Sequence, residues 1–395
     1  MVQPMTSIIL TPLFIFFLFS SLATATTYNV VTLGAKGDGT SDSTDAFLSA
    51  WRAACGSKVP ATIYVPLGKF LLGRTVFSGG DECKNTAIHI QIDGTLLAPS
   101  DYKVIGSSYN WIAFEDVTGV SIYGNGTIDG QGTGLWACKD SGKSCPQGAT
   151  ALEFSDSNNI FIGGLTIVDS QMFHIVINYC NNVQVHGVTV LAPGGSPNTD
   201  GIHVAESSVV TILNSNIATG DDCISIGPGT TNLWIQHINC GPGHGISIGS
   251  LGWDTNEKGV HNVTVTTATF TGTQNGVRIK TWARPSNGFV NGVLFQHLTM
   301  VDVSNPIIID QNYCPGSHDC PNKVSGVKIS NVTYQDIHGS SATEIAMDFD
   351  CSSKYPCSGI ILEDVTLEGS TKPAQSSCTN ARGTNLGVVV PSSCL

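Results

Sequence analysis

The chain has 395 residues and a net charge of −12 at pH 7, and only 12% of its residues are charged. No basic stripe is available to meet phosphates, so this charge balance counts against a nucleic-acid-binding protein. The 44 glycines, set against 5 methionines, indicate β-structure with many tight turns rather than a bundle of helices.

The N-terminal residues are typical of a signal peptide. An apolar run at 8–22 is followed by Ala23 and Ala25 in the A-x-A arrangement of a cleavage site. No Lys or Arg precedes the run, and a membrane anchor is the alternative, but the run is short for a bilayer span. We therefore expect residues 1–25 to be removed, and residues 26–395 to form one secreted domain that is not held in a membrane.

Residues 44–55 carry the clearest helical pattern in the chain. The apolar face of this helix would comprise Phe47, Leu48, Trp51 and Cys55. Ser43 or Thr44 is the expected N-terminal cap. A solenoid exposes an apolar cross-section at its ends, so this helix is expected to cover the first coil of the repeat that follows it.

A short apolar-x-apolar triad recurs along the rest of the chain at intervals of 23 to 40 residues. The triads begin at Val120, Ile160, Val183, Val210, Leu233, Val263, Val293, Val327 and Ile360. A second strand-like piece such as "GIHVA" or "CISIG" follows most of them. This pattern predicts an all-β, single-domain parallel β-helix with a short N-terminal capping helix. A β-sandwich is the alternative, but sandwiches turn about every 8–12 residues instead of repeating one long unit.

The 13 cysteines fit an oxidising compartment. Sequence alone does not assign their partners. Proximity favours the pairs Cys55–Cys83, Cys138–Cys145, Cys223–Cys240, Cys314–Cys320, Cys351–Cys357 and Cys378–Cys394, and it leaves Cys180 as a buried free thiol. Sequons at Asn125, Asn262 and Asn331 are expected to be glycosylated in a secreted eukaryotic protein.

Four of the second strands place polar residues in register. They are "NTDGIHV" (198–204), "GDDCISI" (220–226), "GHGISIG" (243–249) and "NGVRIKT" (275–281), aligned on their first apolar residue. Asp200, Asp222 and His244 then share one offset at steps of 22 residues. Because neighbouring rungs lie about 4.8 Å apart, these three residues would gather within about 10 Å, and Asp221 would join them from the turn.

Arg278 and Lys280 lie two residues apart on the next strand, so they share one face. Two cations inside an apolar solenoid would be too costly, and both are expected to point outward beside the acids. Such a surface stripe suits glycoside hydrolysis, in which one carboxyl group donates a proton and another activates water. Crowding of the carboxylates raises the pKa of at least one of them and keeps it protonated.

Each of these features also has a simpler explanation. Paired Asp residues at the start of a strand are common turn residues, and clustered carboxylates bind Ca²⁺. The 22-residue register counts against the first explanation, and the two nearby cations would repel a metal ion, so no metal site is expected. Alone, His244 would be a hydrogen-bonded structural residue, and Arg278 and Lys280 would form a solvated face.

At these residues the chain resembles the polygalacturonases, a pectin-hydrolysing family of right-handed parallel β-helix enzymes, and most of all their plant branch. The four family motifs occur in order as "NTD", "GDD", "GHG" and "RIK". Each tripeptide alone is weak evidence for the family, but four of them in order at coil spacing are specific evidence for it. The resemblance extends over nearly the whole mature chain, from residues 34–47 to 359–369.

The resemblance implies cofactor-independent hydrolysis of α-1,4-D-galacturonosidic linkages of polygalacturonan in the cell wall, with inversion of configuration. Asp221 would be the general acid, Asp200 and Asp222 together would orient and activate the water, and His244 would tune the acid. Stacked rungs suggest a carboxyl separation nearer 5 Å than the roughly 6.5–9.5 Å of inverting pairs, so inversion is implied by the resemblance alone.

The resemblance also implies a binding site for the sugar. Arg278 and Lys280 would hold the carboxylate of the sugar on the +1 side of the scissile bond. Tyr313 would lie near the same subsite, where a surface packing role is the alternative, and Asn198 would add a hydrogen bond to the substrate or to a neighbour.

Two other functions remain open at this point. The first is a Ca²⁺-dependent pectate lyase, and the second is a non-catalytic pectin-binding protein on the same scaffold. Three crowded acids count against the second, because binding alone does not need them. A monomer is expected, and endo and exo cleavage are both open.

Overall fold

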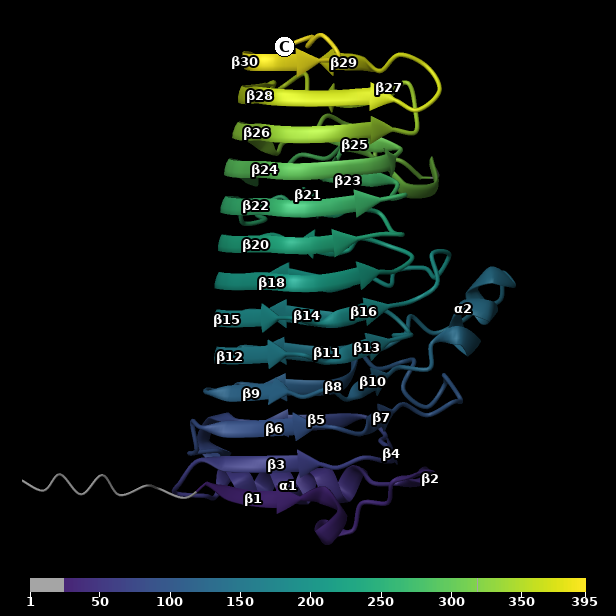
Figure 1. Cartoon of the computed structure of the whole chain (residues 1–395), viewed down its shortest axis with the longest axis vertical. Coiled ribbons are helices and arrows are strands. Elements are labelled where there is room, and N and C mark those ends of the chain that lie inside the picture. Colours follow the sequence, from purple (N-terminus) through teal and green to yellow (C-terminus); the bar gives the residue numbers. More distant parts are fainter. Residues whose placement is uncertain (1–24, 318) are drawn as a thin grey trace, which may run out of the picture.

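The computed structural model describes residues 25–317 and 319–395. The chain winds into a tall solenoid in which each coil contributes strands to two long sheets (Figure 1). Every strand pairing in this part of the chain is parallel. The molecule is therefore an all-β, single-domain right-handed parallel β-helix, in agreement with the predicted fold, and it winds in the sense usual for parallel crossovers.

The larger sheet has 19 strands and the smaller sheet has 11. The larger sheet comprises β1 (Thr26–Asn29), β2 (Asp38–Asp42), β3 (Ala61–Val65), β4 (Lys69–Leu71), β6 (Ile88–Ile92), β7 (Thr95–Leu97), β9 (Val120–Tyr123), β10 (Thr127–Asp129), β12 (Asn158–Gly163), β13 (Thr166–Val168), β15 (Asn181–His186), β16 (Thr189–Leu191), β18 (Ser208–Ala218), β20 (Thr231–Cys240), β22 (Val260–Thr271), β24 (Phe289–Val303), β26 (Lys328–Ser341), β28 (Cys357–Gly369) and β30 (Ala381–Val390). The smaller sheet comprises β5 (Thr75–Ser78), β8 (Asn110–Glu115), β11 (Thr150–Ser155), β14 (Ile175–Asn178), β17 (Ile202–Ala205), β19 (Ile224–Ile226), β21 (Ile246–Leu251), β23 (Asn275–Trp282), β25 (Asn305–Tyr313), β27 (Ile345–Asp350) and β29 (Gln375–Thr379).

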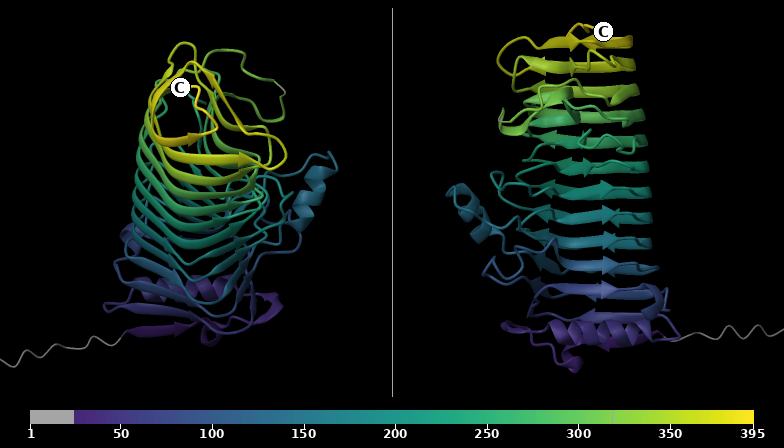
Figure 2. Two further views of the ribbon diagram at one scale, coloured as in Figure 1. Left: turned by 45° about the horizontal axis from the view of Figure 1, so that its top comes forward. Right: turned by 180° about the vertical axis from the view of Figure 1, so that it is seen from behind.

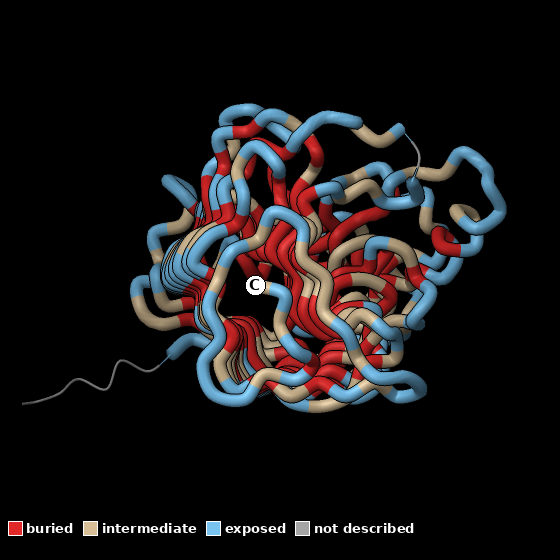
Figure 3. The backbone as a smooth tube through the Cα atoms, turned by 90° about the horizontal axis from the view of Figure 1, so that it is seen from above, coloured by how far each residue is buried: buried red, intermediate tan, exposed pale blue. Residues whose placement is uncertain are grey.

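The core of the solenoid is a set of aliphatic columns that run along its axis. Buried residues line the interior of the coil when it is viewed from above (Figure 3). In the smaller sheet Ile202, Ile224, Ile246, Val277 and Ile307 stack on consecutive rungs, and none of them is exposed. Each coil buries its apolar residues only against its neighbours, which is why the apolar period of the sequence equals the coil length.

The larger sheet follows the predicted triads with one correction. The triads from Val120 to Val293 pair rung by rung as expected. The prediction for Val327 is wrong, because Val293 pairs with Val332 and Val332 pairs with Ile360. Val327 and Ile329 are buried and alternate with Lys328, so they form an apolar triad like the expected one. This triad begins five residues before Val332, which is the residue that pairs with Val293.

The predicted N-terminal helix is α1 (Thr44–Cys55), and it covers the first coil (Figure 1). Its buried residues include Phe47, Trp51 and Cys55, whereas Leu48 is partly exposed. Ser43 occupies the cap position, but its hydroxyl does not cap the helix. The Asp42 carboxylate accepts the Thr44 N–H at 2.9 Å instead, so the acid in front of the predicted caps satisfies this free donor.

Four shorter elements complete the fold. They are α2 (Thr133–Asp140) and three 3₁₀ turns, η1 (Val30–Leu33), η2 (Gly80–Glu82) and η3 (Pro315–Ser317). The sequence did not predict α2, because eight residues give little periodicity and only Leu135 and Trp136 are buried. Figure 2 shows α2 projecting from one side of the solenoid.

A column of asparagines turns the chain into the larger sheet. Asn159, Asn182, Asn232, Asn262 and Asn331 all have φ between 54° and 57°. Asn tolerates this left-handed conformation better than other residues with a side chain. Asparagines on neighbouring rungs are linked by amide hydrogen bonds, with Asn182 donating to Asn159 at 2.7 Å and Asn262 donating to Asn232 at 2.5 Å. Val209 and Gly292 occupy the rungs between these groups. Two of the sequons therefore lie within a structural column.

The cysteine predictions are confirmed. All six expected disulfides are present, and Cys180 is a buried free thiol. All three sequon asparagines are exposed, and their glycosylation stays a prediction. The predicted signal peptide, except Ala25, lies outside the described residues. Among the residues that are described, no helix combines the length and the apolar character that crossing a bilayer would require.

Candidate active site

The predicted register of the polar residues is present in the smaller sheet. Ile202 pairs with Ile224, Ile224 pairs with Ile246, and Ile246 pairs with Val277. The acids lie in the turns that lead into these strands, and the backbone links the turns. The His244 N–H donates to the Asp221 carbonyl at 2.8 Å, and the Gly201 N–H donates to the Asp222 carbonyl at 2.9 Å. Residues far apart in sequence are thus held together by main-chain hydrogen bonds.

Asp222 is the centre of a buried charge cluster. One carboxylate oxygen accepts from Arg278 Nη2 at 2.9 Å, and the other accepts from Lys280 Nζ at 2.6 Å. The Ser247 hydroxyl donates to the first oxygen at 2.7 Å and accepts from Arg278 Nε at 3.0 Å. The side chains of Asp222, Arg278 and Lys280 are 1%, 10% and 8% exposed.

This burial corrects the expectation of a surface stripe. Arg278 and Lys280 do lie beside the acids, as predicted, but they are covered and not solvated. The cost of burying the two cations is offset by their shared carboxylate and by the hydrogen bonds that complete the cluster.

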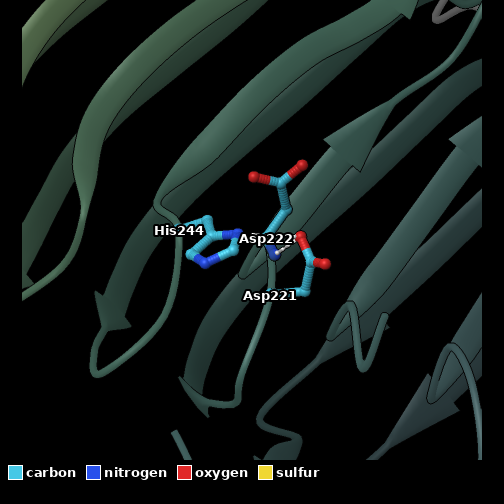
Figure 4. A group of neighbouring side chains, drawn as sticks. All are labelled: Asp221, Asp222 and His244. Atoms are coloured by element: carbon cyan, nitrogen blue, oxygen red, sulfur yellow. Dashed lines mark hydrogen bonds and ion pairs between the residues drawn. The ribbon is translucent and has the colours of Figure 1, made fainter. Parts of the chain in front are cut away.

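Asp221 pairs with His244 at the edge of the cluster (Figure 4). Its Oδ1 lies 3.1 Å from His244 Nδ1 and also accepts the Asp222 N–H at 2.8 Å. Burial raises the pKa of Asp221, but the hydrogen bond and charge of His244, with the charge of Lys280, outweigh it and hold the pKa below its ordinary value. The two adjacent acids therefore have different partners. Asp221 contacts an imidazole, and Asp222 contacts two cations.

Asp200 is the acid whose pKa the site raises. It is 5% exposed. Burial raises the pKa of Asp200 well above its ordinary value, and the charges of Asp221 and Asp222 raise it further, although the Ser225 hydroxyl and Lys280 oppose this. The sequence predicted one protonated acid from crowding alone, whereas burial is the larger cause in the structure.

Asn198 and Tyr313 reach the same place as the acids. An open pocket is lined by Asn198, Asp200, Asp221, Asp222, Lys280 and Tyr313, together with Phe173, His203, Ser225 and several small residues. The Tyr313 ring centroid lies 5.3 Å from Lys280 Nζ and 5.9 Å from Arg278 Cζ, so the ring covers the two cations. All eight predicted residues are therefore gathered at one site, with Arg278 and His244 behind the pocket lining.

Sequence reasoning missed a second polar column in the same strands. His203, Ser225, Ser247 and Arg278 pair with one another on consecutive rungs, each directly after an aligned apolar residue. His203 Nδ1 lies 2.8 Å from the Ser225 hydroxyl, and its ring stacks on Phe173 at 5.1 Å. Burial, aided by the charge of Lys280, lowers the pKa of His203 to about 4. The alignment that located the acids already contained this column.

Asp221, Asp222 and His244 are also close enough to be considered as metal ligands, since one donor atom from each lies within 4.8 Å of the others. Several of their donor atoms are already engaged, however. Both oxygens of Asp222 accept from cations, and His244 Nδ1 faces Asp221. A cation placed here would meet Arg278 and Lys280 at close range, so this donor set is a poor fit for a metal ion.

Comparison with known proteins agrees with this picture. The chain is 63% identical over 384 residues to a polygalacturonase from Prunus persica, and the match covers 97% of each chain. It is 44% identical to an exopolygalacturonase from Platanus acerifolia, over 92% of this chain and 96% of the relative. Among solved structures, a polygalacturonase from Erwinia carotovora ssp. carotovora superimposes with a TM-score of 0.72 at 26% identity, over 92% of this chain and 96% of that one.

The family model for glycosyl hydrolases family 28 matches residues 55–394, a span that contains every residue of the site described above. The chain belongs to glycosyl hydrolases family 28.

Proposed function

We propose that this enzyme hydrolyses α-1,4-D-galacturonosidic linkages of polygalacturonan, the acidic chain of pectin, by inverting acid/base catalysis. The observation that carries the proposal is the joint pocket of three acids with different surroundings. Asp200 is buried and its pKa is raised, Asp221 pairs with His244, and Asp222 lies between two cations. Glycoside hydrolysis needs one protonated and one ionised carboxyl group at the same bond.

In this proposal Asp221 is the general acid and its proton comes from the coupled site. The pKa of Asp221 is lowered and that of Asp200 is raised, so we assign the shared proton to Asp200 before the substrate binds. Bound sugar carboxylates bring negative charge close to Asp221 and raise its pKa. The proton then moves to Asp221, and Asp200 is left ionised next to the water. Acids coupled in this way titrate as a group, so the pKa values seen in a pH–rate profile belong to the group and not to one residue.

The remaining residues hold the reactants. Asp222 orients the attacking water together with Asp200, which accepts the proton of the water as the new C–O bond forms. Asp221 gives its proton to the leaving oxygen as the glycosidic bond breaks. After the bond has broken, the proton taken from the water is on Asp200 and Asp221 is ionised again, which is the starting arrangement. His244 holds Asp221 in position across 3.1 Å and so tunes the acid.

The substrate carboxylate is recognised at the covered end of the pocket. Lys280 lines the pocket, and Arg278 stands behind it under the ring of Tyr313. A sugar carboxylate at this point would share the two cations with Asp222, while Asn198 offers a side-chain amide. No cofactor is needed for this reaction. We further propose that the enzyme is secreted to the cell wall and acts there as a monomer.

Product analysis on polygalacturonic acid with a chelator present tests the proposed function. Saturated products with free reducing ends, formed at an unchanged rate, are expected. Random oligomers would show endo cleavage and monomer alone would show exo cleavage. Products that absorb in the ultraviolet, or loss of activity with the chelator, would identify a Ca²⁺-dependent lyase instead. Binding without any product would identify a non-catalytic pectin-binding protein.

A further inference from the structure

A cluster of aromatic residues next to the pocket holds an arginine to which the mechanism assigns no role. The Arg284 guanidinium lies over the Trp253 ring, with its Cζ 3.8 Å from the ring centroid, and 5.9 Å from that of Trp282. The two indoles meet edge to face at 5.0 Å, and Trp282 meets Tyr313 in the same way at 5.3 Å. Trp253 is 52% exposed. The chain therefore presents a large aromatic surface and a cation to solvent.

Arg284 differs from the other cations of the site because it has no acidic partner. Asp222 already neutralises Arg278 and Lys280. Within residues 25–317 and 319–395, no carboxylate forms an ion pair with Arg284. Its one side-chain hydrogen bond there runs from Nη1 to the Trp253 carbonyl at 3.3 Å. A guanidinium carries five N–H donors, so most of them are free to meet a ligand.

The cluster is placed along the continuation of the substrate-binding strand. Arg278, Lys280 and Trp282 alternate along β23 and share its outer face. Trp282 lies about 7 Å beyond Lys280 at the usual rise per strand residue. Trp282 pairs with Tyr313, which lines the pocket. Trp253, Trp282 and Tyr313 thus form one aromatic surface across three successive rungs.

The loop that carries Trp253 is held in place by a partly buried acid. The Glu257 carboxylate accepts the Gly252 N–H and further backbone N–H groups of Trp253 and Asp254. Burial raises the pKa of Glu257, and these hydrogen bonds oppose that rise. The Arg284 bond to the Trp253 carbonyl adds to these Glu257 bonds, so the loop does not depend on the guanidinium alone.

We propose that Arg284, together with the faces of Trp253 and Trp282, forms a further subsite that binds the carboxylate of a second galacturonate unit, beyond the one at Arg278 and Lys280. This inference rests on the proposed hydrolysis of polygalacturonan. A guanidinium stacked on an aromatic ring is weakly hydrated and presents its planar fork to a carboxylate, while the indole face packs on the apolar side of a sugar ring. The net charge of −12 makes such local cations more important to a polyanionic ligand.

The test compares kcat/KM across oligogalacturonates of increasing length for the wild type and Arg284→Met. We expect the variant to lose about tenfold or more on long oligomers, as for loss of a charge-assisted hydrogen bond, and to match the wild type on the shortest cleaved oligomer. Arg284→Lys should lose less than Arg284→Met. Oligomers that carry a methyl ester only on the unit that would meet Arg284 should be cleaved equally by the wild type and the Met variant.

Arg52→Met is the matched control, because Arg52 is an exposed arginine on α1 at the far end of the solenoid. Arg52→Met should leave kcat/KM unchanged on every substrate. An equal loss by Arg284→Met on every oligomer length, or no loss on any, would overturn the proposed subsite, and Arg284→Lys keeps the test valid if the Met variant does not fold. Absence of hydrolysis by the wild type on every oligomer would instead refute the proposed function.

Discussion

Replacing Asp222 with Asn removes the one negative charge that two buried cations share. The side chains of Arg278 and Lys280 are 10% and 8% exposed, so neither can regain full hydration where it lies. Breaking a buried ion pair by removing one partner costs about 3–5 kcal/mol. A chain of this length has an unfolding entropy of about 0.8 kcal/mol/K, so the melting temperature should fall by about 4–6 °C.

Thermal unfolding at one heating rate and one protein concentration measures this change. Asp336→Asn is a matched control, because Asp336 also pairs with two bases, His297 and His338, but lies 41% exposed on the outer wall. Exposed pairs contribute about 0–1 kcal/mol, so the control should lower the melting temperature by about 1 °C or less. Combining Asp222→Asn with Lys280→Met should restore part of the loss. Equal melting temperatures for the wild type and Asp222→Asn would refute the structural role of the cluster.

Four further predictions concern the same site and its surroundings. Because the folded pKa of Asp200 is raised, its stabilising contribution is complete below the unfolded pKa of about 3.9 and is lost as the pH rises through the folded value. Asp200→Asn cannot ionise, so its melting temperature should rise relative to the wild type between pH 3.5 and 7, and a constant difference would contradict this. Asp221→Asn should lower kcat by roughly 10²–10⁴-fold with its fold intact, as for loss of a proton donor; near-normal turnover would remove it as the acid. Burial raises the pKa of the Cys180 thiol to about 11, so a thiol reagent followed by mass spectrometry should label it only after denaturation, and rapid labelling of the native protein would show it to be accessible. KM for long galacturonan chains should rise only modestly with salt, because few cations contact the ligand, and a steep rise would reveal a basic groove.

The alternation and spacing of apolar residues were enough to predict the fold and the rungs of the site. Ile202, Ile224 and Ile246 must stack to bury their side chains, and that stacking forces the preceding acids together. The pattern was ambiguous at Val327, because apolar triads begin at both Val327 and Val332 and only the pairing of β26 with β24 selects between them.

Burial and protonation within the site could not be predicted in the same way. Strand alternation says on which side of a sheet Lys280 lies, but not whether a turn covers it. The same limit explains why Asp200 and Asp221 could not be ranked by proton affinity, because that ranking depends on the His244 contact and on how deeply each carboxylate lies. The aromatic contacts of Arg284 could not be predicted, because Trp253 and Trp282 belong to different coils and no repeat of the sequence relates them.

The coils that carry the acids are also the shortest, with 22 residues between paired positions on β17, β19 and β21. The coils below and above bear the longest excursions, α2 on one side and the loop after β25 on the other, and both project from the same flank of the molecule (Figures 1 and 2). The acids thus lie on short coils between two long loops, and none of the three acids comes from either loop. Lengthening or shortening either loop would change which part of a polymer can reach the acids. The hydrogen bonds and ion pairs of the acid cluster would stay as they are.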